Sequence, residues 1–344
     1  DLLPDPLVQF NPSYEKREAF EDLVAEGILH RDVLHAVNLF PPFRHQIEAI
    51  KLGVSGKGFV VTSGTGSGKS LTYLTTIFDA LLKKSKDKEK GIKAILVYPM
   101  NALINSQFEE ISKYEKTYEE RTGQSFPISF AKYTGQEGTE EREKTQKNKS
   151  DIILTNYMML ELLMTRRNEK WFRKSISKNL EFLVYDELHT YRGRQGSDVS
   201  LLNRRIQALA EKELILIGTS ATMASKGTPE QKKKAVAEVA EIIFGKKYEL
   251  NQIVNEYLVP SLDKGAPTET ELKKAIEQGI DIGGDEEAFK KHPLAKWIEM
   301  NVALKYNEDV LERGIPLSIP QIVQKLKKSV SLEDEVLLKI SQIF

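Results

Sequence analysis

Six short apolar runs, rich in β-branched and aromatic residues, alternate with longer stretches of helical periodicity in the first two thirds of the chain. They occupy residues 58–62, 93–98, 127–133, 151–155, 180–187 and 214–220. This alternation predicts an α/β fold with a doubly wound, mainly parallel sheet, because parallel strands need crossover connections. Each run ends where a polar or glycine-containing segment begins. We therefore expect the functional site at the carboxyl ends of these strands, where open parallel sheets carry their ligand-binding loops.

The same patterns divide the chain into three parts. Residues 1–39 combine an extended segment with helical patterns, and residues 40–226 contain all six apolar runs. From residue 227 to residue 344 only helical patterns remain, with breaks at 265–267 and 283–284. We expect an N-terminal helical extension, one α/β domain and a C-terminal helical region.

Composition limits the possible chemistry. The chain has no cysteine, which excludes disulfides, thiolate catalysis and cysteine-ligated zinc. Lys and Arg total 50, as do Asp and Glu, so composition alone gives no electrostatic argument for nucleic acid. No run of 18 apolar residues occurs, and the first residues lack a signal-peptide pattern. The expected location is therefore cytoplasmic.

A glycine-rich turn, SGTGSGKS, lies between the first apolar run and a helical stretch. This is a P-loop pattern, in which backbone N–H groups and a helix N-terminus hold phosphates. Lys69 is expected to reach the β- and γ-phosphates, and Ser70 to coordinate magnesium. Ser63 replaces the glycine of the strict pattern, but only the later glycines approach the phosphates closely. The predicted ATP-binding residues of this turn are Ser63, Gly64, Thr65, Gly66, Ser67, Gly68, Lys69 and Ser70.

An acidic motif, DELH, ends the fifth apolar run and follows the P-loop in the sequence. Asp186 is expected to hold magnesium through water, and Glu187 to orient and deprotonate the water that attacks the γ-phosphate. Such an Asp-Glu pair is common at strand ends, and the preceding P-loop is what favours the catalytic interpretation. His189 either couples this motif to the next one or is a core histidine.

Gln46 lies upstream of the P-loop, in the string LFPPFRHQIEAI. Its planar amide has the geometry to pair with N6 and N7 of adenine, which selects adenine over guanine. Phe43 or Phe40 is a candidate to stack on the base. The alternative is a glutamine that only begins a helix.

Six strings, SGTGSGKS, YPMNALINSQ, YTGQ, ILTNYMML, DELH and GTSAT, occur in this order between residues 40 and 223. They resemble motifs I, Ia, Ib, Ic, II and III of superfamily 2 DExH-box helicases. The strings YPMNALINSQ, DELHTYRGRQGSDV and SLLNRR are similar to those of large YprA-like and Lhr-like bacterial DNA helicases, whereas DEAD-box RNA helicases carry PTRELA and DEAD. The resemblance implies a RecA-like ATP-binding lobe over residues 40–226.

Further site residues are implied by the resemblance. Ser220, Ala221 and Thr222 would couple hydrolysis to movement along a strand. Hydroxyls, amides and helix N-termini suit contacts with the phosphates of a single strand. The expected contact residues are Asn101, Asn105, Gln107, Thr134, Gly135 and Thr155, with Arg192 and Arg194 as basic candidates.

The activity implied by the resemblance is that of an ATP- and magnesium-dependent DNA helicase or translocase, moving 3′ to 5′ in DNA repair or phage defence. The alternatives are an RNA helicase lobe and a nucleotide-gated scaffold that binds nucleic acid or partners without unwinding. Motors of this superfamily hydrolyse ATP between two lobes, and the second supplies arginines from a Q-x-x-G-R-x-x-R type motif. No such string occurs here. We therefore expect residues 227–344 to lead toward a second lobe and the chain alone to be nearly inactive.

Overall fold

The computed structural model divides the chain into two compact units, which are described separately below. One unit comprises residues 16–256, and the other combines residues 1–15 with residues 257–344. The structure describes residues 6–10, 12–37, 40–64, 66–84, 90–221, 227–263, 265–278 and 285–330.

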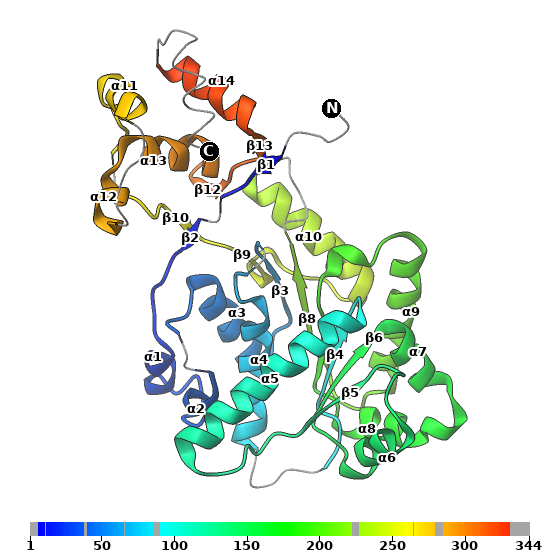
Figure 1. Cartoon of the computed structure of the whole chain (residues 1–344). Helices are drawn as coiled ribbons and strands as arrows, with labels where there is room; N and C mark the ends of the chain where they lie inside the picture. The colour runs from blue at the N-terminus through cyan, green and yellow to red at the C-terminus, as the bar shows by residue number, and fades with distance from the viewer. Residues whose placement is uncertain are drawn as a thin grey trace. The chain divides into compact units, whose positions relative to one another are not determined.

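The unit of residues 16–256 is built on a seven-stranded parallel sheet with the order β5-β6-β4-β7-β8-β3-β9 (Figure 1). Six strands coincide with the six predicted runs, which confirms the predicted fold. They are β3 (Phe59–Thr62), β4 (Ala94–Tyr98), β5 (Phe130–Tyr133), β6 (Ile152–Asn156), β7 (Phe182–Tyr185) and β8 (Ile215–Ser220). The seventh, β9 (Ile253–Asn255), lies outside every predicted run, because three residues are too few to show a strand pattern.

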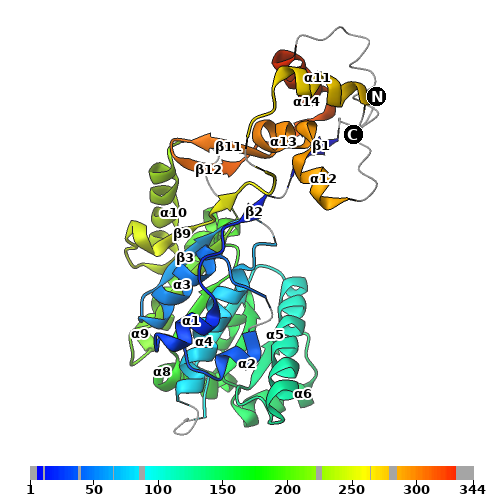
Figure 2. The same cartoon turned by 90° about the vertical axis from the view of Figure 1, so that its left-hand side faces the viewer.

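Helices cover both faces of this sheet (Figure 2). One face packs against α1 (Phe20–Ala25), α2 (Val33–Val37), α3 (Arg44–Val54), α4 (Lys69–Lys83) and α5 (Asn101–Thr122). The other packs against α7 (Tyr157–Thr165), α8 (Lys170–Asn179), α9 (Gly193–Leu209) and α10 (Pro229–Phe244). Helix α6 (Thr139–Asn148) connects β5 to β6, and short 3-10 turns span Arg167–Glu169, Leu188–Thr190 and Leu250–Gln252. Within the described ranges, no helix has both the length and the apolar character needed to cross a bilayer.

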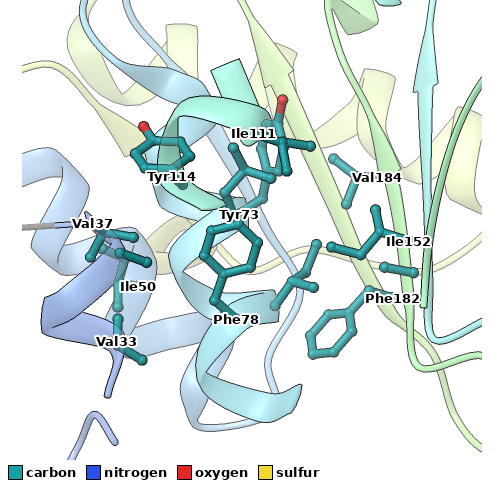
Figure 3. Packing of buried hydrophobic residues seen from close by; sticks show 14 of the residues in the cluster. Val33, Val37, Ile50, Tyr73, Phe78, Ile111, Tyr114, Ile152, Phe182 and Val184 are labelled. Atoms are coloured by element: carbon teal, nitrogen blue, oxygen red, sulfur yellow. The ribbon is translucent and has the colours of Figure 1, made fainter. Parts of the chain in front are cut away.

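Successive residues of the central strands enter different cores. Phe59 and Val61 of β3 pack on the side of α1–α5, whereas Val60 packs on the side of α7–α10. Figure 3 shows the first core, where Tyr73 and Phe78 of α4 lie between the sheet and helices α2 and α3. Each buried side chain of this size contributes about 1.5–3 kcal/mol. Burial on both faces therefore fixes the strands whose carboxyl ends carry the site.

The limits of this unit differ from the predicted boundaries at residues 40 and 226. Helices α1 and α2 belong to it, because Phe20, Leu23 and Val33 are fully buried in the core shared with α3–α5. At the other end, α10 packs against α9 and β9 pairs with β3, so the unit extends to Glu256.

The other unit joins the beginning of the chain to its last quarter. Helices α11 (Glu269–Gln278), α12 (Glu286–Lys291), α13 (Pro293–Ile298) and α14 (Ile319–Ser329) accompany a π-helical turn at Glu299–Ala303. Antiparallel pairs form between β1 (Leu7–Val8) and β13 (Leu317–Ser318), β2 (Ser13–Tyr14) and β10 (Leu258–Val259), and β11 (Leu304–Asn307) and β12 (Val310–Arg313). The prediction of helices alone after residue 227 is therefore wrong. These strands have two to four residues, and two of the three pairs join strands from opposite ends of the sequence.

Candidate active site

The P-loop forms the turn from β3 to α4, at the carboxyl edge of the sheet. Gly66 and Gly68 have positive φ angles of 77° and 70°, which glycine adopts without strain. A Cβ atom at Gly68 would lie 2.4 Å from Nε2 of Gln46, so a larger residue there would displace the Gln46 side chain. Lys69 is the first residue of α4, and its Nζ donates to the Ser63 carbonyl at 3.1 Å. The loop therefore encloses the amino group of Lys69, the residue predicted to contact the phosphates.

Ser63 and the remaining loop residues also have defined places. The Ser63 hydroxyl is buried and hydrogen-bonds to the Ser67 hydroxyl across the turn, which explains how serine substitutes for the usual glycine. Ser70 is the second residue of α4, next to Lys69. Gly64 donates its N–H to the Glu256 carboxylate at 2.8 Å. Thr65 lies outside the described residues.

Gln46 packs directly against the P-loop rather than facing open space. Its Nε2 donates to the carbonyls of Ser67 (3.2 Å) and Gly68 (3.0 Å), while its Oε1 accepts from the Phe43 N–H at 2.8 Å. The side chain is buried. To pair with adenine as predicted, the Gln46 amide would have to give up its bonds to Ser67, Gly68 and Phe43. Phe43 is half-buried and stacks on His45, with ring centroids 5.8 Å apart.

Asp186 and Glu187 directly follow β7. In the sheet, β8 lies between β7 and β3, the strand that leads into the P-loop. The Asp186 carboxylate accepts a hydrogen bond from the Thr219 hydroxyl of β8. Burial raises the pKa of Asp186 to about 6, against an ordinary value of 3.8. The Glu187 backbone has φ 54°, a left-handed conformation, and its N–H donates to the Thr219 hydroxyl at 3.1 Å. Thr219, which the sequence did not single out, therefore fixes both acidic residues.

The Glu187 side chain is where the three motifs meet. Its Oε1 lies 3.7 Å from Nζ of Lys69, and its Oε2 lies 3.1 Å from Nδ1 of His189. The Ala221 N–H also donates to Oε2, at 3.2 Å. One carboxylate thus contacts the P-loop, the DELH motif and the segment after β8.

His189 and Ser220 form a second link between the DELH motif and β8. Nδ1 of His189 lies 3.1 Å from the Ser220 hydroxyl, which in turn donates to the Ala221 carbonyl at 2.8 Å. The His189 side chain is one-third exposed, so His189 is not a core histidine, and its coupling role stays a prediction. Thr222, the third predicted coupling residue, lies outside the described residues.

The donor set suits a magnesium ion that arrives with a nucleotide. Ser70 supplies a hydroxyl and Asp186 a carboxylate, and Mg²⁺ prefers such oxygen ligands completed by water and phosphate. The raised pKa of Asp186 reflects a charge poorly compensated by its surroundings, which a cation would stabilise. In the described ranges, no cluster of three acidic or imidazole groups forms a site of its own.

A hollow of about 410 Å³ lies at the ends of β5 and β6. Predicted contact residues Thr134 and Gly135 line it, together with Asn156 and Arg166, which the sequence analysis missed. Both predicted residues donate to the Glu137 carboxylate. Burial opposes ionisation of Glu137, but these bonds outweigh it and lower its pKa. Asn156 directly follows Thr155 at the end of β6, and this position in the sequence could have identified it as a candidate contact residue.

Four other predicted contact residues lie in two places, near the ends of β5 and β6 and at the start of α9. Asn101 accepts from Asn156 at 2.8 Å, and Asn105 accepts from Lys132 at 3.1 Å, so both lie near the ends of β5 and β6. Arg192 and Arg194 are exposed at the start of α9.

Two predicted contact residues point elsewhere. Thr155 is fully buried, and its hydroxyl donates to the Tyr133 carbonyl at 2.7 Å, so it supports the strand end instead of presenting a hydroxyl to a phosphate. Gln107 contacts the hydroxyl of Tyr73 at 3.5 Å and Glu110 at 3.1 Å, on the side of the P-loop helix.

Comparisons with known proteins identify the family of this chain. The sequence matches the DEAD/DEAH box helicase family over residues 43–230. It is 29% identical over 252 residues to the uncharacterized ATP-dependent helicase MJ1574 of Methanocaldococcus jannaschii, covering 70% of this chain and 34% of that protein. It is 29% identical over 186 residues to the uncharacterized ATP-dependent helicase YprA of Bacillus subtilis, covering 53% of this chain and 23% of that protein. The fold is similar to that of the DUF1998 helicase MrfA in its crystal structure with DNA and AMPPNP (TM-score 0.56, 20% identity, 79% of this chain and 36% of that chain).

The chain spans about a third of the length of MJ1574 and less than a quarter of YprA. The similarity to YprA confirms the resemblance indicated by the motif strings. The family match covers more than half of the chain and includes the P-loop, the DELH motif and the segment after β8. The chain therefore belongs to the DEAD/DEAH box helicase family.

Proposed function

We propose that this chain binds ATP with magnesium and forms the nucleotide-binding lobe of a nucleic-acid-dependent ATPase. The observation that carries the proposal is the position of Glu187, which contacts Lys69, His189 and the Ala221 N–H. A carboxylate that only stabilised the fold would not need a left-handed backbone beside a P-loop lysine.

Each residue has a role that follows from its contacts. The N–H groups of the P-loop and the N-terminus of α4 bind the phosphates, and Lys69 exchanges its bond to the Ser63 carbonyl for the β- and γ-oxygens. Ser70 and Asp186 would hold magnesium, which when bound neutralises charge on the phosphates. Glu187 orients the attacking water and accepts its proton.

The second part of the proposal concerns the strand. The hollow is lined by Thr134, Gly135, Asn156 and Arg166, whose amide, hydroxyl and guanidinium groups suit a phosphate backbone. Thr134 and Gly135 would exchange their bonds to the Glu137 carboxylate for phosphate oxygens. We favour single-stranded DNA, because MrfA has been crystallised with DNA and the motif strings resemble DNA helicases. Movement from 3′ to 5′, and a setting in repair or phage defence, rest on that resemblance.

Arginines from a second RecA-like lobe of a longer chain complete the hydrolytic site in this proposal. An RNA helicase lobe is the nearest alternative, and a nucleotide-gated scaffold is the alternative from another class. The contacts of Glu187 favour an active site over a scaffold.

The test is a titration of the 344-residue chain with a fluorescent ATP analogue in the presence of magnesium. Lys69→Ala should weaken binding by about 2 kcal/mol, roughly 30-fold, since it removes a charge-assisted contact with phosphate. Lys84→Ala is the matched control, because Lys84 lies just after the same helix and pairs with Glu181 far from the loop. Equal affinities for the two variants would remove the P-loop assignment.

Strand preference is measured separately, by fluorescence anisotropy with single-stranded DNA and RNA of equal length and sequence. Tighter binding of DNA supports the proposal. Equal binding, or tighter binding of RNA, would favour the RNA helicase alternative.

A further inference from the structure

Two donors from neighbouring residues converge on one carbonyl of the P-loop. Nε2 of His45 lies 3.2 Å from the Ser67 carbonyl oxygen, and Nε2 of Gln46 donates to the same oxygen at 3.2 Å. His45, Gln46 and Ser67 are all buried, with exposed fractions of 0%, 4% and 1%. A buried carbonyl is costly when it loses its last hydrogen bond, and one bond is enough to avoid that cost. The Ser67 carbonyl therefore has one donor more than the loop requires.

The imidazole of His45 is fixed as a donor. A carbonyl oxygen can only accept, so the contact places the proton of the neutral ring on Nε2. Burial lowers the pKa of His45 below its ordinary value of 6.5, so the ring is neutral at physiological pH. The ring also stacks on Phe43, with centroids 5.8 Å apart and an interplanar angle of 18°. Burial and stacking therefore hold the ring in the orientation that directs Nε2 to the loop.

Gln46 has a second use that His45 lacks. To pair with adenine, its amide must leave the Ser67 and Gly68 carbonyls and the Phe43 N–H. Gly68 is exposed and Phe43 is half-buried at the start of α3, so water can replace the amide at both. The Ser67 carbonyl is buried, and a second protein donor is needed to satisfy it when the amide leaves. His45 supplies that donor.

We propose that His45 is a positioning residue that makes adenine recognition possible. Its bond to the Ser67 carbonyl keeps the P-loop in shape while Gln46 turns from the loop to the base. The loop that binds the phosphates and the amide that reads the base can then coexist in the ATP-bound state. This inference rests on the proposed ATP-binding function and deepens it, because it names the group that allows one site to recognise both phosphates and base.

Substitutions of His45 can separate its N–H from its ring. In His45→Phe the planar ring and its stacking on Phe43 remain, but the N–H is lost. In His45→Gln the ring is lost, but an amide N–H takes about the position of Nε2. His35→Phe is the matched control, because His35 lies in α2 and its ring packs against Tyr118 of α5, with centroids 6.1 Å apart.

The experiment compares the affinities of the full chain for ATP and for inorganic tripolyphosphate. Each is measured with magnesium, by displacement of a fluorescent ATP analogue. Tripolyphosphate meets the same loop but has no base, so it binds without moving Gln46. His45→Phe should weaken ATP binding about 10-fold, the usual effect of a buried carbonyl left without a donor, and tripolyphosphate binding by less than about 2-fold. His45→Gln should bring ATP affinity back to within about 3-fold of wild type, and His35→Phe should change neither affinity.

His45→Asn is a second variant, which keeps a polar side chain but is too short to reach the Ser67 carbonyl. It should reproduce the loss that is selective for ATP, even if His45→Phe fails to fold. Equal losses for ATP and tripolyphosphate in these variants overturn the inference, because His45 would then support the loop whether or not a base is bound. Unchanged ATP affinity in both variants also overturns it. A wild-type chain that binds neither ATP nor tripolyphosphate would instead refute the proposed function.

Discussion

Glu187 combines a strained backbone conformation with a proposed chemical role. A non-glycine residue in the left-handed region costs roughly 1–2 kcal/mol, and here the Thr219 hydroxyl holds the backbone while Lys69 and His189 hold the carboxylate. The sequence predicts a catalytic role for Glu187, because strand, acid pair and P-loop occur in one α/β pattern, and this role stays a prediction. Its backbone conformation and its dependence on Thr219 could not be predicted, since a threonine inside a strand has the same pattern whether or not it bonds to a neighbouring loop.

Glu187→Gln should separate nucleotide binding from hydrolysis. The amide keeps the size of the side chain but cannot accept a proton, so ATP affinity should stay within a few-fold while turnover in the two-lobe protein falls about 100-fold. Steady-state hydrolysis and analogue binding measure the two effects. Glu213→Gln, at an 82% exposed carboxylate, is the control. Turnover within a few-fold of wild type would show that another group is the base.

Asp186 should make the stability of the metal-free chain depend on pH. Its folded pKa of about 6 lies above the ordinary value of 3.8, so the folded chain binds more protons between these values. The free energy of unfolding should therefore fall as pH rises from about 4 to about 6, by up to about 3 kcal/mol, and then level off. Denaturant titrations in EDTA measure this fall, and Asp186→Asn should lack it. Parallel profiles for the two proteins would contradict the raised pKa.

At the scale of elements, β9 was not predicted from the sequence, yet the residue that follows it contacts the P-loop. β9 runs parallel to β3, and three hydrogen bonds join its end to the last residue of β3 and to the P-loop. Thr62 donates its hydroxyl to Asn255 at 2.6 Å, Glu256 donates its N–H to the Thr62 carbonyl at 3.1 Å, and Gly64 donates to the Glu256 carboxylate at 2.8 Å. Long apolar runs can be recognised as strands from the sequence because their pattern repeats. A strand of three residues shows no such pattern, and β9 is recognised only from its pairing with β3, almost 200 positions away.

Glu256→Gln should strengthen ATP binding. The Glu256 carboxylate accepts a hydrogen bond from the Gly64 N–H and places a negative charge beside the phosphate site. Removing this charge should raise the affinity for ATP about 3- to 10-fold at low salt. Titration with the fluorescent analogue at two salt concentrations measures the effect, which should shrink as salt rises. Glu249→Gln, an exposed residue shortly before β9, is the control. Weaker binding by Glu256→Gln would mean that its bond to Gly64 shapes the loop for the nucleotide.

At the scale of the whole molecule, the chain combines one P-loop sheet with a smaller unit of short strands and helices. It spans about a third of the length of MJ1574, and in the proposed function a second lobe completes the hydrolytic site. An arginine finger accelerates phosphoryl transfer by about 10³- to 10⁵-fold, so a lobe that receives none should hydrolyse little ATP even with an intact Glu187.

The 344-residue chain alone should therefore bind ATP with magnesium, yet show negligible hydrolysis stimulated by a single strand and no unwinding. Phosphate release with and without single-stranded DNA measures this. Robust stimulated hydrolysis that disappears in Lys69→Ala would contradict the prediction and indicate an arginine supplied by a second copy of the chain.

The packing of α1 and α2 determines where the ATP-binding unit can be separated from the rest. Phe20, Leu23, Val33 and Val37 are buried against the same core as the P-loop helix. At about 1.5–3 kcal/mol each, these four side chains amount to roughly 6–12 kcal/mol, which is comparable to the entire stability of a typical domain. A polypeptide of residues 16–256 should consequently fold and remain monodisperse, whereas one starting at residue 40, where the catalytic motifs begin, should expose this apolar face and aggregate.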